Sequence, residues 1–87
     1  MRGQAKTNAA AGLLDDAASE RWERLRSWRA GIAKEHGVPA YVVFHDATLA
    51  ELARERPATT AELGRISGIG ASKLERYGAD LLAILRE

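Results

Sequence analysis

The chain has 87 residues, no cysteine and a formal net charge of +1, from thirteen Lys and Arg against twelve Asp and Glu. This length allows one domain with a small and mostly local core. The lack of cysteine excludes disulfides, thiolate nucleophiles and cysteine metal sites, and it fits an intracellular, cytoplasmic protein. No apolar run approaches the ~20 residues of a membrane span. The near-neutral charge differs from the basic balance of a tight nucleic-acid binder.

Residues 1–14 show no useful hydrophobic period and contain two glycines and a run of alanines. We interpret them as a flexible leader, either a linker from a longer protein or an expression remnant. The folded domain is therefore expected to cover residues 15–87.

The first predicted helix runs to about Glu35, with Gly37 just past its end and Pro39 preventing its continuation. Its N-cap is one of three suitable polar residues: Asp15, Asp16 or Ser19. Apolar residues recur at helical spacing and define one buried stripe: Trp22, Leu25, Trp28, Ile32 and Ala33. Arg29 shares this stripe, so we predict that it pairs with a carboxylate such as Asp46.

Residues 38–44 read VPAYVVF, an apolar run whose propensity favours a strand. No other stretch offers a partner, and an isolated strand leaves its backbone groups unpaired. We therefore predict a short 3₁₀ or extended segment after Pro39 that plugs a helical core. We expect Val42, Val43 and Phe44 to fill this core, whereas Tyr41 can face either the core or the solvent.

A second helix is predicted to begin at Asp46 and to end at Arg56, because Pro57 follows. Thr59 and Glu62 form a Thr-x-x-Glu capping box that opens a third helix. Two apolar residues of this third helix face inward: Leu63 and Ile66.

The last predicted helix carries its apolar residues in one stripe: Leu74, Tyr77, Leu81, Ile84 and Leu85. The stripe continues across Gly78, which costs about 1 kcal/mol relative to alanine in a helix interior, so we expect a kink or a brief break there. The predicted fold is all-α, a compact bundle of four to five short helices.

The stretch ISGIGASK at residues 66–73 has the local form of a helix-hairpin-helix turn. Glycine lets the backbone turn sharply, and the free N–H groups at a helix start suit an anion such as phosphate. One interpretation is a phosphate site formed by the backbone of Gly68 and Gly70, with Lys73 supplying charge. The alternative is a helix–helix corner in which the glycines permit the angle and Ile69 fills the core.

Three basic residues lie near this turn: Arg65, Lys73 and Arg76. They form a candidate strip for a nucleic-acid backbone, although the neighbouring Glu62 and Glu75 also allow an ordinary solvated face. Tyr41 is the candidate aromatic residue, because an exposed ring stacks on single-stranded bases. Its alternative role is packing.

We predict no catalytic site, no metal site and no cofactor. The two histidines, His36 and His45, lack a recognisable nucleophile or ligand partner, and the carboxylates are spread along helix faces. The chain also lacks the Gly-x-x-x-x-Gly-Lys-Ser/Thr loop of ATP-hydrolysing motors, so it does not hydrolyse ATP itself.

Taken as a set, these residues resemble the HRDC domain, a module named for helicases and RNase D. The likeness runs from about Ala18 to Arg86. It rests mainly on the string VPAYVVFHDATL at residues 38–49, followed by Gly68-Ile69-Gly70, Lys73 and Tyr77-Gly78. The string is similar to those in the HRDC modules of bacterial RecQ-type helicases.

The resemblance implies a small helical bundle at the C-terminal end of a multidomain bacterial helicase, cytoplasmic and associated with the nucleoid. It implies weak binding of single-stranded or branched DNA, and tuning of the motor's substrate choice in DNA repair or recombination. The family's aromatic residue after the proline corresponds to Tyr41, and its helix-start lysine to Lys73. We expect a monomer that contacts the helicase core of its parent chain. A protein-docking module with little DNA affinity and an RNA-binding module are the alternatives.

Overall fold

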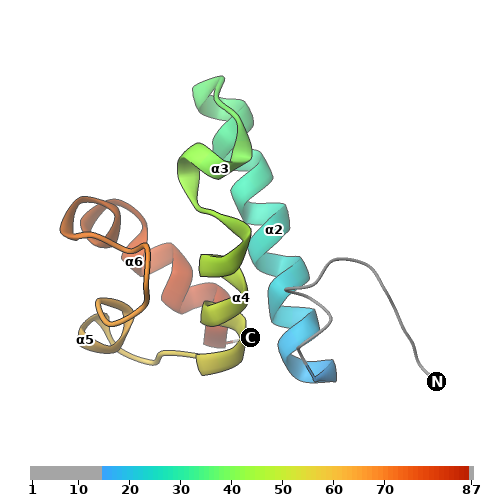
Figure 1. The fold of residues 1–87 in the computed structure, drawn as a ribbon, viewed down its shortest axis with the longest axis vertical. Coiled ribbons are helices and arrows are strands. Elements are labelled where there is room, and N and C mark those ends of the chain that lie inside the picture. Colours follow the sequence, from blue (N-terminus) through green and yellow to red (C-terminus); the bar gives the residue numbers. More distant parts are fainter. Residues whose placement is uncertain (1–14, 87) are drawn as a thin grey trace.

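The computed structural model describes residues 15–86, which form five helices and no strand (Figure 1). The helices are α2 (Asp16–His36), α3 (Ala40–Val43), α4 (Asp46–Glu55), α5 (Thr60–Leu63) and α6 (Ala71–Arg86). The predicted all-α bundle is confirmed for these residues, while the leader predicted for residues 1–14 lies outside them.

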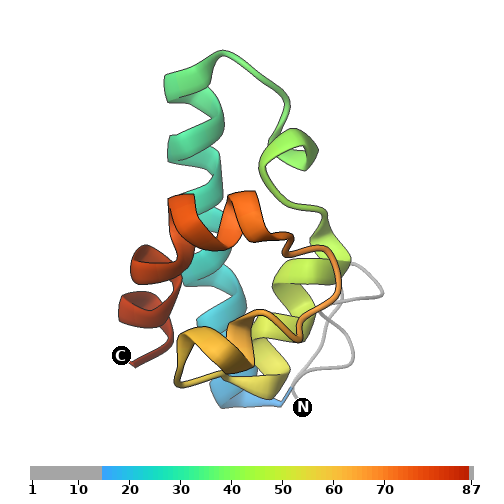
Figure 2. The same ribbon diagram turned by 90° about the vertical axis from the view of Figure 1, so that its left-hand side faces the viewer.

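The long helix α2 is the axis of the bundle, and α3, α4 and α6 all pack against it. The short helix α5 packs on α6. Both views place α3 near the C-terminal end of α2 and α5 towards the opposite end of the molecule (Figures 1 and 2). The short helices α3 and α5 are therefore well separated, and basic residues beside α5 lie away from those beside α3.

The ends of α2 follow the predicted capping signals. The carboxylate of Asp15 accepts a hydrogen bond from the Ala18 N–H at 2.8 Å. At the other end Gly37 takes the left-handed conformation with φ of 65°, and the Val38 N–H donates to the Ala33 carbonyl at 3.0 Å. The polar start and the glycine end of this helix are thus both confirmed.

The segment after Pro39 is one turn of α-helix rather than the predicted 3₁₀ or extended plug. Its closing hydrogen bond runs from the Phe44 N–H to the Ala40 carbonyl at 3.3 Å. Val43 and Phe44 are buried as expected, but Val42 is 46% exposed, so its predicted place in the core is wrong. Successive side chains on a helix point about 100° apart, and three in a row cannot all face one core. Tyr41 faces the solvent and is 61% exposed.

The predicted Thr59 cap of α5 is confirmed, whereas the return bond of Glu62 goes to the N–H of Ala58 and not to that of the cap residue itself. The Thr59 hydroxyl accepts from the Glu62 N–H at 3.2 Å, and the Glu62 carboxylate accepts from the Ala58 N–H at 2.8 Å. The preceding helix α4 ends at Glu55, and its C-cap residue Arg56 has a left-handed φ of 48°.

Helix α6 continues through Gly78, so of the predicted kink or brief break the break does not occur. Gly78 is buried, and a Cβ built there would lie 3.6 Å from Leu74 Cδ1 and 3.8 Å from Leu63 Cδ1. These are ordinary van der Waals distances, so the packing of α5 on α6 leaves room for a Cβ at this position.

Three aromatic rings meet where α2, α3 and α6 converge. Trp28 lies 6.0 Å from Phe44 and 5.4 Å from Tyr77 between ring centroids, and Phe44 lies 5.8 Å from Tyr77. The rest of the core is mainly aliphatic, with fully buried Leu25, Leu49, Leu52, Leu63, Leu81 and Leu85 beside Trp22. None of the described helices is long and apolar enough to cross a membrane.

Candidate nucleic-acid interface

Lys73 joins the start of α6 to the end of α3. Its Nζ donates to the carbonyls of Val42 at 3.2 Å and Val43 at 2.7 Å, and it lies 5.1 Å from the centroid of the Phe44 ring. These carbonyls have no helical partner because α3 ends after one turn. The contact places α3, with the exposed Tyr41, directly beside the first turn of α6. The two bonds also occupy N–H donors of the Lys73 ammonium, which we predicted from the sequence to contact a phosphate.

A basic recess of about 180 Å³ lies where α2 ends, between α3 and α6. We define it by the basic side chains His36, Lys73 and Arg76, with Val42 on its α3 side. Arg76 is exposed, its guanidinium lies 5.8 Å from the Tyr77 ring centroid, and no carboxylate within residues 15–86 pairs with it. The recess therefore offers a cationic group that is free to meet an anion.

His36 was not predicted as part of this site. It is the last residue of α2, and it lines the recess with Arg76 of α6, the helix that packs against α2. Only the three-dimensional arrangement brings these two residues to one recess, although forty positions of sequence separate them.

A second hollow, of about 490 Å³, lies beside Tyr41 at the junction of α3 and α4. This aromatic pocket is lined by Arg29, Ala40, Tyr41, His45, Asp46 and Ala47. The rings of Tyr41 and His45 are inclined by 27° with their centroids 6.1 Å apart. His45, which sequence reasoning treated only as a helix-start residue, thus extends the aromatic surface that Tyr41 exposes.

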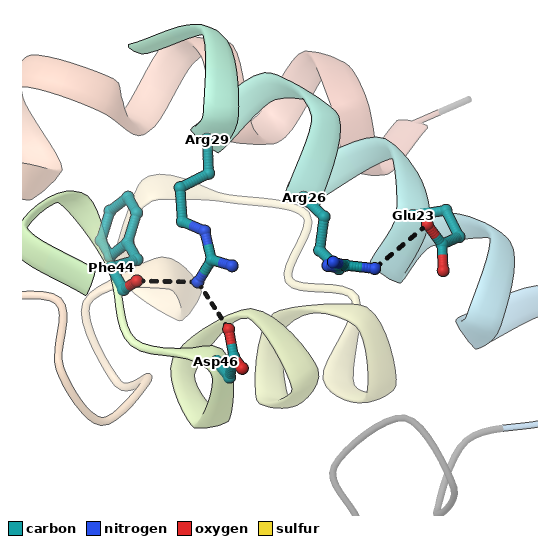
Figure 3. A network of polar contacts seen from close by, with 5 residues as sticks. All are labelled: Glu23, Arg26, Arg29, Phe44 and Asp46. Carbon is teal, nitrogen blue, oxygen red and sulfur yellow. Dashed lines mark hydrogen bonds and ion pairs between the residues drawn. The ribbon is translucent and has the colours of Figure 1, made fainter. Parts of the chain in front are cut away.

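Arg29 fixes the backbone that carries this pocket (Figure 3). Its side chain reaches from α2 and donates through one nitrogen to the Phe44 carbonyl at 2.9 Å and to Asp46 Oδ1 at 2.8 Å. Arg29 is only 8% exposed, whereas the Asp46 side chain is 58% exposed. The predicted pair between these residues is confirmed, and it holds the α3–α4 junction against α2.

The glycine turn is closely packed at its first glycine. Gly68 has φ of 93°, and a Cβ there would overlap Thr48 Oγ1, which itself donates to the Ser67 carbonyl at 3.1 Å. Ile69 is buried, while an added Cβ at Gly70 would meet no atom within 4 Å. These contacts favour the structural corner over the phosphate site, which stays a prediction for the backbone of Gly68 and Gly70.

Of the three residues of the predicted strip, Lys73 and Arg76 line the same recess and Arg65 does not. Arg65 lines a separate hollow of about 360 Å³, among the carboxylates Glu51, Glu55 and Glu62. The residues that line it come from α4, α5 and the segments beside α5, and both views show α5 away from α3 (Figures 1 and 2). The sharp turn between Arg65 and α6 separates residues that are near in sequence. Arg76 and Tyr41 border neighbouring hollows, and Arg65 borders neither of these two.

Within residues 15–86, no group of three or more His, Asp and Glu side chains is placed to hold a metal ion.

Comparison with known proteins agrees with this fold. The family model of the HRDC domain matches residues 18–85. The ATP-dependent DNA helicase UvrD2 of Mycobacterium tuberculosis is 54% identical over 63 residues, which is 72% of this chain and 9% of that helicase. The ATP-dependent DNA helicase RecQ of Pasteurella multocida is 45% identical over 64 residues, 74% of this chain and 10% of that helicase.

A solved structure, HRDC domain 3 of D. radiodurans RecQ, superposes with a TM-score of 0.76 at 39% sequence identity. The match covers 79% of this chain and 91% of that one. The chain spans about a tenth of the length of the curated relatives it matches. Since the family model covers most of the chain and the fold agrees, this chain belongs to the HRDC domain family.

Proposed function

We propose that this domain is an auxiliary, non-catalytic module of an ATP-dependent DNA helicase and that it binds single-stranded DNA weakly. Its relatives support the first part, because they are DNA helicases in which the matching region is about a tenth of the chain. One observation supports the second part: the exposed Tyr41 lines the aromatic pocket on α3, and the next residues of the same helix, Val42 and Val43, line the basic recess with Lys73 and Arg76.

In this proposal a base stacks on Tyr41 and the neighbouring phosphates meet Arg76 and His36 in the basic recess. Stacking of a base on an aromatic side chain contributes about 1–3 kcal/mol and tolerates any sequence. Lys73 acts chiefly by holding α3 in place, with its remaining charge adding to the recess. Two or three cationic contacts on a domain of net charge +1 lead to weak binding.

Weak binding is sufficient for a module that is tethered to a motor. A linked domain meets its ligand at a high effective concentration once the motor has engaged DNA. Such a module would favour substrates that present a single strand near the motor, including branched DNA, and so modulate which substrates the helicase acts on in repair or recombination.

The first test is a titration of fluorescently labelled single-stranded DNA at low salt, followed by anisotropy. Tyr41→Ala should weaken binding about tenfold, because it removes a stacking surface. Since Tyr41 is exposed, the fold should survive this substitution. Arg76→Ala should weaken binding several-fold through loss of a phosphate contact.

Arg65→Ala is the matched control, because Arg65 is an exposed arginine surrounded by carboxylates away from α3. It should leave the dissociation constant within about twofold of the original value. The proposal fails if the domain shows no binding below millimolar concentration, or if Arg65→Ala weakens binding as much as Arg76→Ala.

A protein-docking role is the second candidate, because Tyr41 and Val42 are the large apolar side chains exposed within residues 15–86. In that case the pair would contact the helicase core of the parent chain. An amide-shift titration separates the two roles. Shifts at α3 on adding the core, with none on adding single-stranded DNA, would favour docking.

A further inference from the structure

The aromatic pocket contains a hydrogen-bonding group that base stacking alone does not use. Asp46 lines the pocket together with Tyr41 and His45, and its side chain is 58% exposed. Its Oδ1 accepts from Arg29, whereas its Oδ2 has no hydrogen-bond partner within residues 15–86. The pocket therefore combines an aromatic surface with a carboxylate oxygen that is free to accept.

Asp46 is held in a defined place. The guanidinium of Arg29 is buried and is itself fixed by the Phe44 carbonyl at 2.9 Å (Figure 3). Asp46 is also the first residue of α4, so its backbone is part of a regular helix. A carboxylate held by a charge-assisted bond at one oxygen presents the other with little loss of side-chain freedom.

The two hollows beside α3 differ in the chemistry that they offer. The basic recess has His36, Lys73 and Arg76, which suit a phosphodiester, whereas the aromatic pocket has a carboxylate whose charge is balanced by Arg29. A strand crossing α3 would therefore place its backbone towards the basic recess and its base towards the aromatic pocket.

We propose that the aromatic pocket binds a single unstacked nucleobase and that Asp46 selects bases with an exocyclic amino group. This inference rests on the proposed function, since it names the base preference of the same surface. An ionised carboxylate only accepts hydrogen bonds. It pairs with the amino group of cytosine, adenine or guanine, whereas the only ring donor of uracil or thymine, N3–H, lies between the O2 and O4 carbonyls, which repel the carboxylate.

The experiment compares oligodeoxynucleotides of equal length that contain only cytosine or only uracil as the base. The two bases share the same ring and differ only at N3 and at position 4. Their stacking areas are therefore nearly equal. The domain should bind the cytosine strand about three- to tenfold more tightly, as expected for one net hydrogen bond at an exposed site.

Asp46→Asn tests the residue, because its amide oxygen can still accept from Arg29 while the second position becomes an NH₂ donor. It should bring the ratio of the two dissociation constants close to one. Glu51→Gln is the matched control: it makes the same chemical change beside Arg65, away from the aromatic pocket, and should preserve the cytosine preference.

The outcomes separate this inference from the function on which it rests. Equal binding of both strands by the unmodified domain overturns the base preference and leaves single-stranded DNA binding standing. A cytosine preference that survives in Asp46→Asn overturns the role of Asp46. Binding of neither strand overturns the proposed function and this inference together.

Discussion

Several basic side chains within residues 15–86 donate hydrogen bonds to main-chain carbonyls near the C-terminal ends of helices. The donors Arg21, Arg29, Arg56 and Lys73 reach the carbonyls of Ala53, Phe44, Leu85 and the pair Val42 and Val43, respectively, at 2.7–3.2 Å. Carbonyls at helix ends lack helical partners and carry the negative end of the helix dipole, so cations suit them. A count of basic residues therefore overstates the cationic charge that is free to meet a ligand.

We expect the two glycines of the turn to differ in how much stability is lost when each is replaced by alanine. Gly68 has φ of 93° and packs against Thr48, so Gly68→Ala should lower the free energy of unfolding by about 2 kcal/mol. Gly70 has no positive φ, and an added Cβ there would meet no atom within 4 Å. Gly70→Ala should therefore change the free energy of unfolding by less than about 0.5 kcal/mol. Urea unfolding of both variants measures the difference.

Equal losses of stability in the two glycine variants would contradict this interpretation of the turn. The same variants also test the phosphate site predicted from the sequence. If Gly70→Ala weakens DNA binding without changing stability, the backbone of the turn contacts the ligand after all.

Single residues were predictable where a local rule decides them. Asp15, Gly37 and Thr59 have the helix-end roles that their residue types favour, because caps depend on a few neighbouring positions. Arg29 was predictable because an arginine on an apolar stripe needs a partner when it is buried. Val42 was not, since its exposure depends on which side of a one-turn helix meets α2.

At the scale of elements, α3 shows where local reasoning stops. The absence of a partner strand correctly excluded a β-strand, but isolated helices of one turn have no stability of their own. Pro39 starts the turn, and Lys73 binds its terminal carbonyls from 30 and 31 positions further along the chain. Such a long-range contact leaves no pattern in the run VPAYVVF, so the α-helical turn could not be predicted from it.

The link between α6 and α3 can be tested by removing the ammonium of Lys73 while keeping its alkyl chain. Lys73→Met should lower the free energy of unfolding by about 1–2 kcal/mol, because two carbonyls lose a charged donor. It should also weaken DNA binding, since α3 carries Tyr41. Urea unfolding and the anisotropy titration measure the two effects.

Lys34→Met provides the control for this prediction. Lys34 is an exposed lysine in the last turn of α2, and its ammonium makes no hydrogen bond or ion pair within residues 15–86. Its substitution should change stability by less than about 0.5 kcal/mol. If Lys73→Met is as mild as Lys34→Met, Lys73 does not anchor α3 in solution.

At the scale of the whole molecule, basic residues that are close in sequence, such as Arg65 and Arg76, line different hollows. Arg65 lies among carboxylates beside α5, whereas Arg76 borders the basic recess near α3. Tyr41 and Arg76 were predictable as candidates from residue type and from the resemblance. His36 and His45 were not, because only the three-dimensional packing brings His36 to the recess of Arg76 and His45 to the pocket of Tyr41.

This division of charge predicts a shallow salt dependence for DNA binding. The logarithm of the association constant falls with the logarithm of salt concentration by about 0.7 for each phosphate neutralised on a single strand. With Arg76 and one further cation in contact, the slope should be about −1.4, and Arg76→Ala should reduce it by about 0.7.

Anisotropy titrations at several sodium chloride concentrations measure this slope. Arg65→Ala should leave it unchanged, because Arg65 is predicted to meet no phosphate. A slope steeper than about −4 would require more cationic contacts than the basic recess provides and would extend the interface to another face. A slope of zero would mean that the strand meets the domain through Tyr41 alone, without help from the basic recess.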